Sequence, residues 1–283
     1  MGALINTMRK FLIVLFSSFL LCSTSFAEDI IFSPISKDNL ETTARIFEPF
    51  IKLIESRTGL SIKSKYQLNY GDILADFAAG KVDLAYLGPL PIVELERKYP
   101  HVEKIATFLS EKGEPSYTCS IIRMKGDKTN MADFKGRMAL TQPLSTCGLY
   151  NATQYFSRMN RDIGTVNYFF SGSHTRVVLD VMTGKAEAGS LQTSIAKNYL
   201  YQNIEIISES DPYPGFTLVA NTKTLSADKI KKIKEAVLAF DPAHNAADKK
   251  TAETLGKNFR FGAVQPDESI FSRMKRDHML LNL

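Results

Sequence analysis

The chain has 283 residues, of which 44% are hydrophobic and 23% charged, and its net charge is +5 at pH 7. The lysines and arginines form no dense stripe, which argues against a nucleic-acid-binding protein, whereas the mild positive excess is compatible with a small anionic ligand. The four histidines, His101, His174, His244 and His278, are scattered without an H-x-x-H or C-x-x-C pair, so we expect no metal site and no cofactor.

The first 27 residues have the pattern of a secretory signal peptide. A basic start at residues 8–10 precedes an apolar run at residues 11–21, and Ser25-Phe26-Ala27 is a small-x-small cleavage site. The apolar run is too short to span a membrane, and Leu21 before Cys22 is not the small residue that a lipid-attachment site needs. We therefore expect cleavage after Ala27 and a soluble periplasmic protein. It would carry 33 basic and 30 acidic residues, because Arg9 and Lys10 are removed.

The mature chain opens with alternating strands and helices. Apolar runs predict strands at residues 30–32, 61–66 and 82–86, and helical periodicity predicts helices at residues 40–55 and 70–79. This alternation indicates an α/β fold with a mostly parallel sheet.

The same order recurs in the second half of the chain. Strands are predicted at residues 118–124, 138–140, 165–170 and 186–191, and helices at residues 149–159 and 174–183. With a constant offset of 104 residues, Tyr70 falls on His174, Gly80-Lys81 on Gly184-Lys185, and Asp83 on Glu187. We interpret this correspondence as two copies of one α/β unit.

A two-fold duplication predicts two lobes rather than a solenoid. Lobe 1 is expected to comprise residues 28–115 and 216–283, and lobe 2 residues 116–215. The C-terminal segment has no counterpart in the repeat and is expected to return to complete lobe 1. The two crossing segments, near residues 113–118 and 211–218, are expected to act as a hinge.

Ligands of open α/β sheets bind at the carboxyl ends of strands, where helix N-termini gather. This rule selects Ser33, Tyr70, the loop Leu87-Gly88-Pro89, Ser145-Thr146 within the segment 140–148, and His174. These positions offer neutral hydrogen-bond donors or a close backbone N–H, which suits a bound oxyanion. Each also has a purely structural interpretation: Ser145-Thr146 as an N-cap, Gly88-Pro89 as a turn, Tyr70 and His174 as half-buried rings with ordinary partners.

Two cysteines remain in the mature chain, Cys119 and Cys147. An even number in an oxidising compartment favours a disulfide, provided that the two residues lie close in space. The alternative is a reactive thiol at a helix N-terminus, which would suit a thiophilic ligand such as a trivalent arsenic species.

Three motifs carry a resemblance to a known family: the run KVDLAYLGPL at residues 81–90, the Ser145-Thr146-x-Gly148 turn, and Ser173-His174. They resemble the periplasmic phosphate-, phosphite- and phosphonate-binding proteins of ABC importers, the PhnD-like family, over most of the mature chain and in the family's order. The resemblance implies a type II solute-binding protein, in which two α/β lobes close on an anion, and we expect a monomer that serves an ABC permease. By motif, Tyr70, Ser145, Thr146 and His174 are expected to hold the ligand oxygens, with further lining from Leu87, Gly88, Cys147, Gly148 and Gln192.

The chain departs from the family pattern in three places. Leu87 stands where the phosphonate binders have an aromatic hydroxyl, and Cys147 where many relatives have a small hydroxyl residue. The stretches at residues 192–194 and 214–216 lack the carboxylates that bind the ammonium group of an aminoalkyl phosphonate. A buried ammonium without a counter-charge is costly, so we expect a small oxyanion without a cationic amine.

Two other function classes were weighed against this interpretation. A hydrolase built on Ser145, His174 and Asp180 would lack the G-x-S-x-G nucleophile elbow, so we expect no enzyme. The same fold can instead serve as a sensory subunit that presents its bound oxyanion to a membrane histidine kinase or chemoreceptor. Importer and sensor would share the cleft and differ on the outer surface, and this alternative stays open at the level of the sequence.

Overall fold

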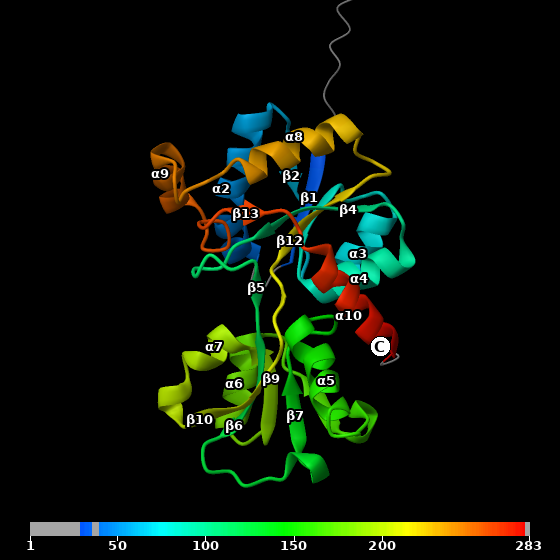
Figure 1. Ribbon diagram of the computed structural model, residues 1–283, viewed down its shortest axis with the longest axis vertical. Coiled ribbons are helices and arrows are strands. Elements are labelled where there is room, and N and C mark those ends of the chain that lie inside the picture. Colours follow the sequence, from blue (N-terminus) through cyan, green and yellow to red (C-terminus); the bar gives the residue numbers. More distant parts are fainter. Residues whose placement is uncertain (1–28, 36–39, 281–283) are drawn as a thin grey trace, which may run out of the picture.

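The computed structural model describes residues 29–35 and 40–280. Two α/β lobes lie one above the other along the long axis of the molecule (Figure 1), and each is built on its own sheet. The sheet of lobe 1 has six strands in the order β13-β4-β12-β3-β1-β2, and that of lobe 2 has five in the order β10-β6-β9-β7-β8. The expected two-lobed α/β fold is therefore confirmed, but both sheets are mixed rather than mostly parallel, because β12 and β4 in lobe 1 and β6 and β10 in lobe 2 pair antiparallel with their neighbours. The predicted signal peptide, residues 1–27 with cleavage after Ala27, lies outside the described residues.

Lobe 1 combines the first and the last parts of the described chain. Its strands are β1 (Ile30–Pro34), β2 (Ile62–Ser64), β3 (Leu84–Leu87), β4 (Val102–Phe108), β12 (Thr217–Asn221) and β13 (Ala263–Val264). Its helices are α2 (Leu40–Thr58), α3 (Tyr70–Ala78), α4 (Pro89–Lys98), α8 (Ala227–Leu238), α9 (Ala246–Thr254) and α10 (Glu268–Leu280). Strand β12 returns from lobe 2 and inserts between β3 and β4, antiparallel to both.

Lobe 2 is formed by the middle of the chain. Its strands are β6 (Cys119–Met124), β7 (Arg137–Leu140), β8 (Asn167–Phe170), β9 (Ala188–Gln192) and β10 (Ile204–Glu209). Its helices are α5 (Asn151–Ser157), α6 (His174–Met182) and α7 (Thr193–Lys197), and its shorter helical turns are η1 (Met131–Asp133), η2 (Thr146–Tyr150), η3 (Ile163–Thr165) and η4 (Leu200–Gln202).

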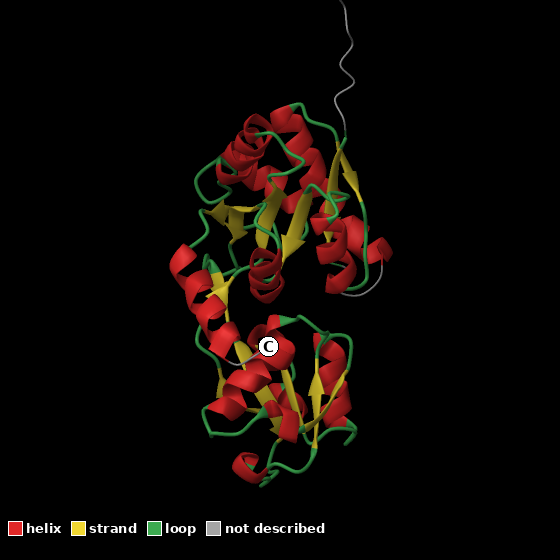
Figure 2. Ribbon diagram, turned by 90° about the vertical axis from the view of Figure 1, so that its right-hand side faces the viewer, coloured by secondary structure: helices red, strands yellow, loops and turns green. Residues whose placement is uncertain are grey.

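Two short antiparallel strands connect the lobes. Strand β5 (Ser116–Tyr117) pairs with β11 (Tyr213–Pro214), so that Tyr117 lies opposite Tyr213 and Ser116 opposite Pro214. Seen from the side (Figure 2), the two lobes again lie one above the other along the long axis. The chain crosses from one lobe to the other at these two strands, which lie within the hinge segments expected at residues 113–118 and 211–218. The lobe limits at residues 115/116 and 215/216 stay a prediction.

The internal duplication is present in the structure. Both lobes contain a central parallel strand, β1 or β7, flanked by the two strands that follow it, β2 and β3 or β8 and β9. The acidic residues that the offset aligned have the same role, because Asp83 Oδ2 accepts from the N–H of Ile31 at 2.7 Å and Glu187 Oε2 from the N–H of Arg137 at 2.6 Å. Each carboxylate thereby ties the start of its strand to the neighbouring central strand.

Two elements differ from the sequence expectation. Helix α4 follows Gly88 directly, and Pro89, which the sequence analysis placed in a loop, is its first residue. Proline is tolerated in the first helical turn, since the N–H that it lacks has no partner inside the helix. The helix predicted at residues 149–159 is preceded by the turn η2, which starts at Thr146 and is kinked at Gly148 by its non-helical backbone, and it ends earlier than expected, as α5 at Ser157.

Apolar packing continues from one lobe into the other. One buried cluster contains Leu87 and Leu90 of lobe 1 together with Cys119, Cys147 and Tyr150 of lobe 2. Helix α10 (red in Figure 1) runs beside this contact, and Arg273 on it donates to the carbonyl of Pro212 next to the hinge at 2.7 Å. The lobes are therefore in contact at the level of the expected site.

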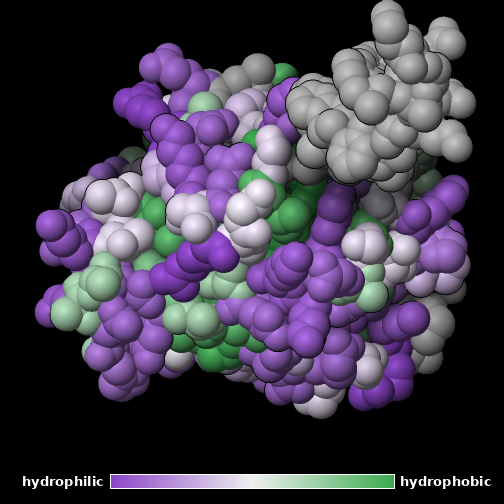
Figure 3. Space-filling view, turned by 90° about the horizontal axis from the view of Figure 1, so that it is seen from above, coloured by the Kyte–Doolittle hydropathy of each residue, from purple (hydrophilic) through white to green (hydrophobic). Residues whose placement is uncertain are grey.

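The outer end of lobe 1 is mostly hydrophilic (Figure 3). Helix α8 contributes to this end with i, i+4 ion pairs such as Lys232 with Asp228 at 3.1 Å. Within residues 29–35 and 40–280, no helix combines the length and the apolar composition that crossing a membrane requires.

Candidate ligand-binding site

Lobe 1 presents Tyr70 at the start of a helix. Tyr70 is the first residue of α3, which Asn69 caps by accepting from the N–H of Asp72 at 2.8 Å. The Tyr70 hydroxyl lies 3.7 Å from the position that a Cβ on Gly88 would occupy. Burial raises the pKa of this phenol well above its ordinary value, because the charged form would be desolvated. Tyr70 is therefore a protonated hydrogen-bond donor beside Gly88.

Helix α4 also begins at the edge of lobe 1 that faces lobe 2. Its N-cap residue is Gly88, which offers no side chain, and Pro89 at the next position has no N–H. The first available backbone donor is therefore Leu90. Its N–H donates to Oγ1 of Thr146, at 3.1 Å, and this bond joins the two lobes.

The turn between β7 and α5 supplies the facing side of lobe 2. Ser145 precedes η2 as its N-cap residue, and its side chain makes no capping hydrogen bond there. Ser145 and Thr146 are both buried. Gly148 is required sterically, because a Cβ at this position would lie 2.6 Å from Oγ1 of Thr141 and 3.2 Å from the carbonyl oxygen of Gln142. The turn is thus packed too closely for a side chain at residue 148.

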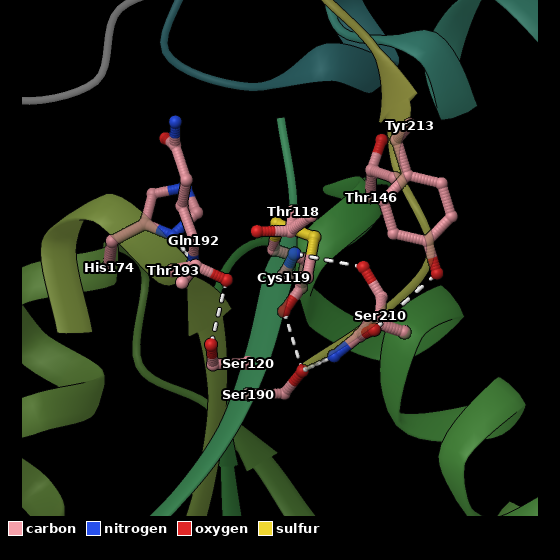
Figure 4. The surroundings of a disulfide bond; sticks show 12 residues. Thr118, Cys119, Ser120, Thr146, His174, Ser190, Gln192, Thr193, Ser210 and Tyr213 are labelled. Atoms are coloured by element: carbon pink, nitrogen blue, oxygen red, sulfur yellow. Dashed lines mark hydrogen bonds between the residues drawn. A yellow bond between two sulfur atoms is a disulfide. The ribbon is translucent and has the colours of Figure 1, made fainter. Parts of the chain in front are cut away.

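His174 and Gln192 lie next to each other at the top of lobe 2. Ser173 caps α6 by accepting from the N–H of Arg176 at 3.2 Å, which places His174 at the first helical position. Nδ1 of His174 accepts from the backbone N–H of Gln192 at 3.1 Å. In the neutral ring the proton is therefore on Nε2, which is a donor. Figure 4 shows the Gln192 side chain extending from the end of β9 toward lobe 1, with the His174 ring beside it.

Cys119 and Cys147 are paired as a disulfide beside this site (Figure 4), with their Cα atoms 5.2 Å apart. The bond connects the first strand of lobe 2 to the turn that carries Ser145 and Thr146. Ser190 Oγ donates to the Cys147 carbonyl at 2.7 Å and accepts from Nδ2 of Asn151 at 2.9 Å, which fixes the turn further. Both cysteines are buried, so the pairing favours the structural interpretation over a thiol presented to a ligand.

Two tyrosines that the sequence interpretation missed belong to the same region. Tyr117 lies on the hinge strand β5, and burial raises the pKa of its phenol, whereas a hydrogen bond with the Thr146 side chain acts in the opposite direction. Tyr86 stacks on Phe216 at 5.2 Å between ring centroids, and Phe216 stacks on Tyr117 at 6.1 Å. Tyr117 thus brings an aromatic hydroxyl to the Thr146 side chain, whereas the Leu87 side chain has none. The only sequence signal for the two tyrosines was the position of Tyr86 one residue earlier and of Tyr117 in the expected hinge.

Not every residue selected from the sequence reaches the site as a polar group. Leu87 is completely buried in the apolar cluster and offers only packing. The Ser33 hydroxyl is used inside lobe 1, where it lies 2.8 Å from the Lys65 carbonyl oxygen and 3.0 Å from Oε1 of Gln67. Tyr70, Gly88, Thr146 and Cys147 are brought together, with Ser145 and Gly148 in the same turn.

The catalytic alternative finds no support in the geometry. Asp180 is buried and bound to Ser171 at 2.7 Å, Arg176 at 3.2 Å and Lys185 at 3.3 Å. Nδ1 of His174 accepts a backbone N–H and therefore does not donate to a carboxylate as a catalytic triad requires. Among the residues that the structure describes, no group of three or more histidine, cysteine, aspartate or glutamate side chains is arranged to hold a metal ion.

Comparison with known proteins gives consistent matches. A family model described as the periplasmic phosphonate substrate-binding protein of ABC transporters matches residues 32–269. The phosphate-import protein PhnD of Mycolicibacterium smegmatis is 25% identical over 228 residues, which are 74% of this chain and 71% of that protein.

Two solved structures show the same fold. PhnD1 of Prochlorococcus marinus in complex with methylphosphonate has a TM-score of 0.74 at 17% identity and covers 90% of this chain and 99% of its own. The binding component of an ABC phosphonate transporter from Pseudomonas aeruginosa has a TM-score of 0.72 at 22% identity, with 89% and 86% covered. The chain therefore has the two-lobed type II binding-protein architecture.

Proposed function

The chain belongs to the periplasmic substrate-binding proteins of phosphonate ABC transporters, and on this premise we propose that its two lobes close on a small oxyanion and deliver it to an ABC permease. A member of this family binds and hands over its ligand without converting it, so the chain is not an enzyme. We further propose that it works as a monomer after removal of residues 1–27, with Cys119 and Cys147 oxidised in the periplasm.

The observation that supports the proposal is the contact between the lobes at the start of α4, where the Leu90 N–H donates to Thr146 Oγ1, with further neutral donors at helix starts in each lobe. Tyr70 and the start of α4 come from lobe 1, and the Thr146 hydroxyl and His174 come from lobe 2. Helix N-termini add the positive ends of their dipoles, which favours an anion without a full positive charge. We propose that Tyr70, Ser145, Thr146 and His174 hold the ligand oxygens, and that Gly88, Cys147, Gly148 and Gln192 line the site with Leu87 behind it.

The choice of ligand follows from the absence of an acid at the residues proposed for the site. Gln192 ends β9 with a carboxamide, which offers an ammonium group no counter-charge. Phosphate, phosphite and simple alkyl phosphonates need donors only for their oxygens, and these the site supplies. We therefore propose an amine-free oxyanion of this class as the ligand.

A thermal-shift screen of the oxidised mature chain tests the proposal. The panel is phosphate, phosphite, methylphosphonate, arsenite, arsenate, sulfate and selenate, each at several concentrations, with 2-aminoethylphosphonate as the amine-bearing comparison. A ligand at 100 times its Kd stabilises the folded state by about 2.7 kcal/mol, which for a chain of this size raises Tm by about 5–10 °C. We expect such a rise for at least one phosphorus oxyanion. If none of the anions changes Tm at millimolar concentration, the proposed function is wrong.

A further inference from the structure

Helix α4 receives its N-terminal cap from the other lobe. Gly88 holds the N-cap position and has no side chain to accept a hydrogen bond, so the helix has no cap of its own. Thr146 Oγ1 accepts the Leu90 N–H instead, across a separation of 56 residues in the sequence. Both residues are nearly inaccessible, with 3% of Thr146 and 5% of Leu90 exposed. The Thr146 hydroxyl therefore does for α4 what a serine or threonine at residue 88 would do.

This bond depends on how the lobes are placed. Leu90 belongs to lobe 1 and Thr146 to lobe 2, and only the strands β5 and β11 join the two sheets. A rotation about these strands that opens the cleft separates the two atoms, and the Leu90 N–H then has only water as a partner. The capping bond therefore needs an arrangement in which the start of α4 and the turn at Thr146 are in contact, as they are here.

The same hydroxyl has one proton left to donate. Its oxygen accepts from Leu90, so the proton is directed elsewhere, and the Tyr117 phenol on the hinge is a neighbouring side chain that interacts with it. An anionic oxygen is a much stronger acceptor than a phenol, and hydrogen bonds in series polarise one another. An oxyanion bound in this position would therefore accept a hydrogen bond from the Thr146 hydroxyl. At the same time, Thr146 Oγ1 would accept the hydrogen bond from the Leu90 N–H.

We infer that Thr146 is a closure latch, a residue whose hydroxyl caps α4 from the opposite lobe only when the lobes are closed. In the closed arrangement Thr146 Oγ1 accepts from the N-terminus of α4 and its proton is donated to the bound anion. The role of Thr146 toward the anion rests on the proposed function, whereas its role toward Leu90 does not. By this route the affinity for the ligand and the closure of the lobes are coupled through one hydroxyl group, since both depend on the same hydrogen bond.

Amide hydrogen exchange at Leu90 tests the latch directly. Pro89 and Pro91 have no amide hydrogen, so the signal of Leu90 is isolated from its chain neighbours in a leucine-labelled NMR sample. We expect Thr146→Val, which keeps the shape and removes the hydroxyl, to raise the exchange rate of Leu90 at least tenfold without any ligand. Thr146→Ser restores the hydroxyl and should stay within about twofold of the original chain. Thr153→Val is the matched control, because Thr153 Oγ1 donates inside lobe 2 to the Leu149 carbonyl at 2.8 Å.

The second readout is binding of methylphosphonate by calorimetry. Loss of one hydrogen bond of ordinary net strength corresponds to about a tenfold weaker Kd for Thr146→Val, with Thr146→Ser close to the original chain. If Leu90 is equally protected in Thr146→Val and in the original chain, the latch is wrong even where anions bind. If instead the exchange pattern is as expected but the original chain binds no anion, the latch stands and the proposed function fails.

Discussion

Tyr70 and His174 occupy the same place in the two lobes: each is the first residue of a nine-residue helix, α3 or α6, and each follows a side chain that caps that helix. Asn69 accepts from the N–H three residues on, and so does Ser173. Gly80 and Gly184, just beyond the two helices, have φ of +74° and +69°, a left-handed conformation that favours glycine. The duplication thus places one ring donor at the start of the corresponding helix in each lobe, a phenol in lobe 1 and an imidazole in lobe 2.

The imidazole gives the first prediction. In His174→Asn the amide can still accept the Gln192 N–H from the position of Nδ1, but the donor at Nε2 is lost. Because hydrogen bonds to charged groups contribute about 1.5–3 kcal/mol, we expect the Kd for methylphosphonate to rise by roughly 10- to 150-fold in calorimetry. His244→Asn is the matched control, since the His244 side chain is 83% exposed and pairs with Asp241 away from the cleft. Unchanged affinity in His174→Asn would show that the imidazole does not hold the anion.

The second prediction concerns the choice between ligands with and without an amine. We expect the original chain to bind methylphosphonate more tightly than 2-aminoethylphosphonate, and Gln192→Glu to reduce or reverse this preference by supplying a counter-charge. An added ion pair that is largely removed from water corresponds to a change of at least about tenfold in the ratio of the two Kd values. Gln202→Glu, on the distant turn η4, adds the same charge as a control. Equal affinity of the original chain for both ligands contradicts the proposed selectivity.

The third prediction concerns the close approach of Gly148 to Thr141. Gly148→Ala places a methyl group 2.6 Å from the Thr141 hydroxyl, and Thr141 Oγ1 is the one buried side-chain oxygen or nitrogen without a hydrogen bond in the described chain. We expect a loss of about 1–3 kcal/mol in the free energy of unfolding, as for other overpacked sites. The loss of stability caused by Gly148→Ala should be smaller in a chain that also carries Thr141→Ala, because the clashing hydroxyl oxygen is then absent.

Urea unfolding of the two single variants and the double variant measures this coupling. Gly88→Ala is the control glycine, because a Cβ there would meet no atom closer than 3.6 Å. An equal loss in both backgrounds would mean that Thr141 is not what requires glycine at residue 148.

The fourth prediction concerns the pairing of Cys119 with Cys147. The two residues are 28 positions apart, and closing a loop of this length in the unfolded chain corresponds to about 3–4 kcal/mol of stability. We expect Cys119→Ser/Cys147→Ser to lower Tm by several degrees and to bind methylphosphonate more weakly, because the turn carrying Thr146 loses its anchor. Thiol titration of the unreduced, unfolded mature chain, which lacks Cys22, should find no free sulfhydryl. Two reactive thiols in that experiment would restore the alternative of a thiol site.

The fifth prediction concerns pH and the buried pair of Glu94 on α4 and His278 on α10. Nε2 of His278 lies 2.6 Å from Oε1 of Glu94, and Lys98 and Arg97 lie 3.0 Å and 3.2 Å from Oε2. Burial lowers the pKa of His278, and the nearby Arg97 and Lys98 add to this, whereas Glu94 acts against it. Burial by itself raises the pKa of Glu94, but the hydrogen bonds from Lys98 and Arg97 and the charge of His278 outweigh it, so that this pKa is also lowered.

Both shifts have the same consequence for stability. A lowered pKa in the folded state means that the unfolded chain takes up the proton first, so the full contribution is present above the ordinary pKa and is lost as the pH falls. We expect the free energy of unfolding to decrease below pH 6.5 for His278 and further below pH 4.5 for Glu94, by at most about 1.4 kcal/mol per pH unit and proton. Urea unfolding between pH 7 and pH 4 measures this slope. In His278→Gln the free energy of unfolding should depend less on pH in the upper part of this range. An unchanged slope there contradicts the assignment of this pH dependence to His278.

Much of the fold was predictable because it depends on patterns that repeat locally. The correspondence of Gly80 with Gly184 and of Asp83 with Glu187 follows from helix ends and strand starts, which a few neighbouring residues specify. Helix α4 was missed, since Pro89 and Pro91 suggest a loop unless the first helical turn is recognised. Such local patterns predict the α/β class and the duplication, and they identify Tyr70 and His174 as equivalent candidates.

Which of the candidates meet depends on how the two lobes pack against each other. The bond between Leu90 and Thr146, the Tyr117 phenol beside that hydroxyl, and the contact of Thr141 with Gly148 join residues without any common spacing. The physical reason is that a side-chain hydrogen bond is short-ranged and directional, so it forms or fails with shifts of less than an ångström in how two lobes pack. Hydrophobic periodicity specifies which face of an element is buried, but not which atom of the opposite lobe that face will touch.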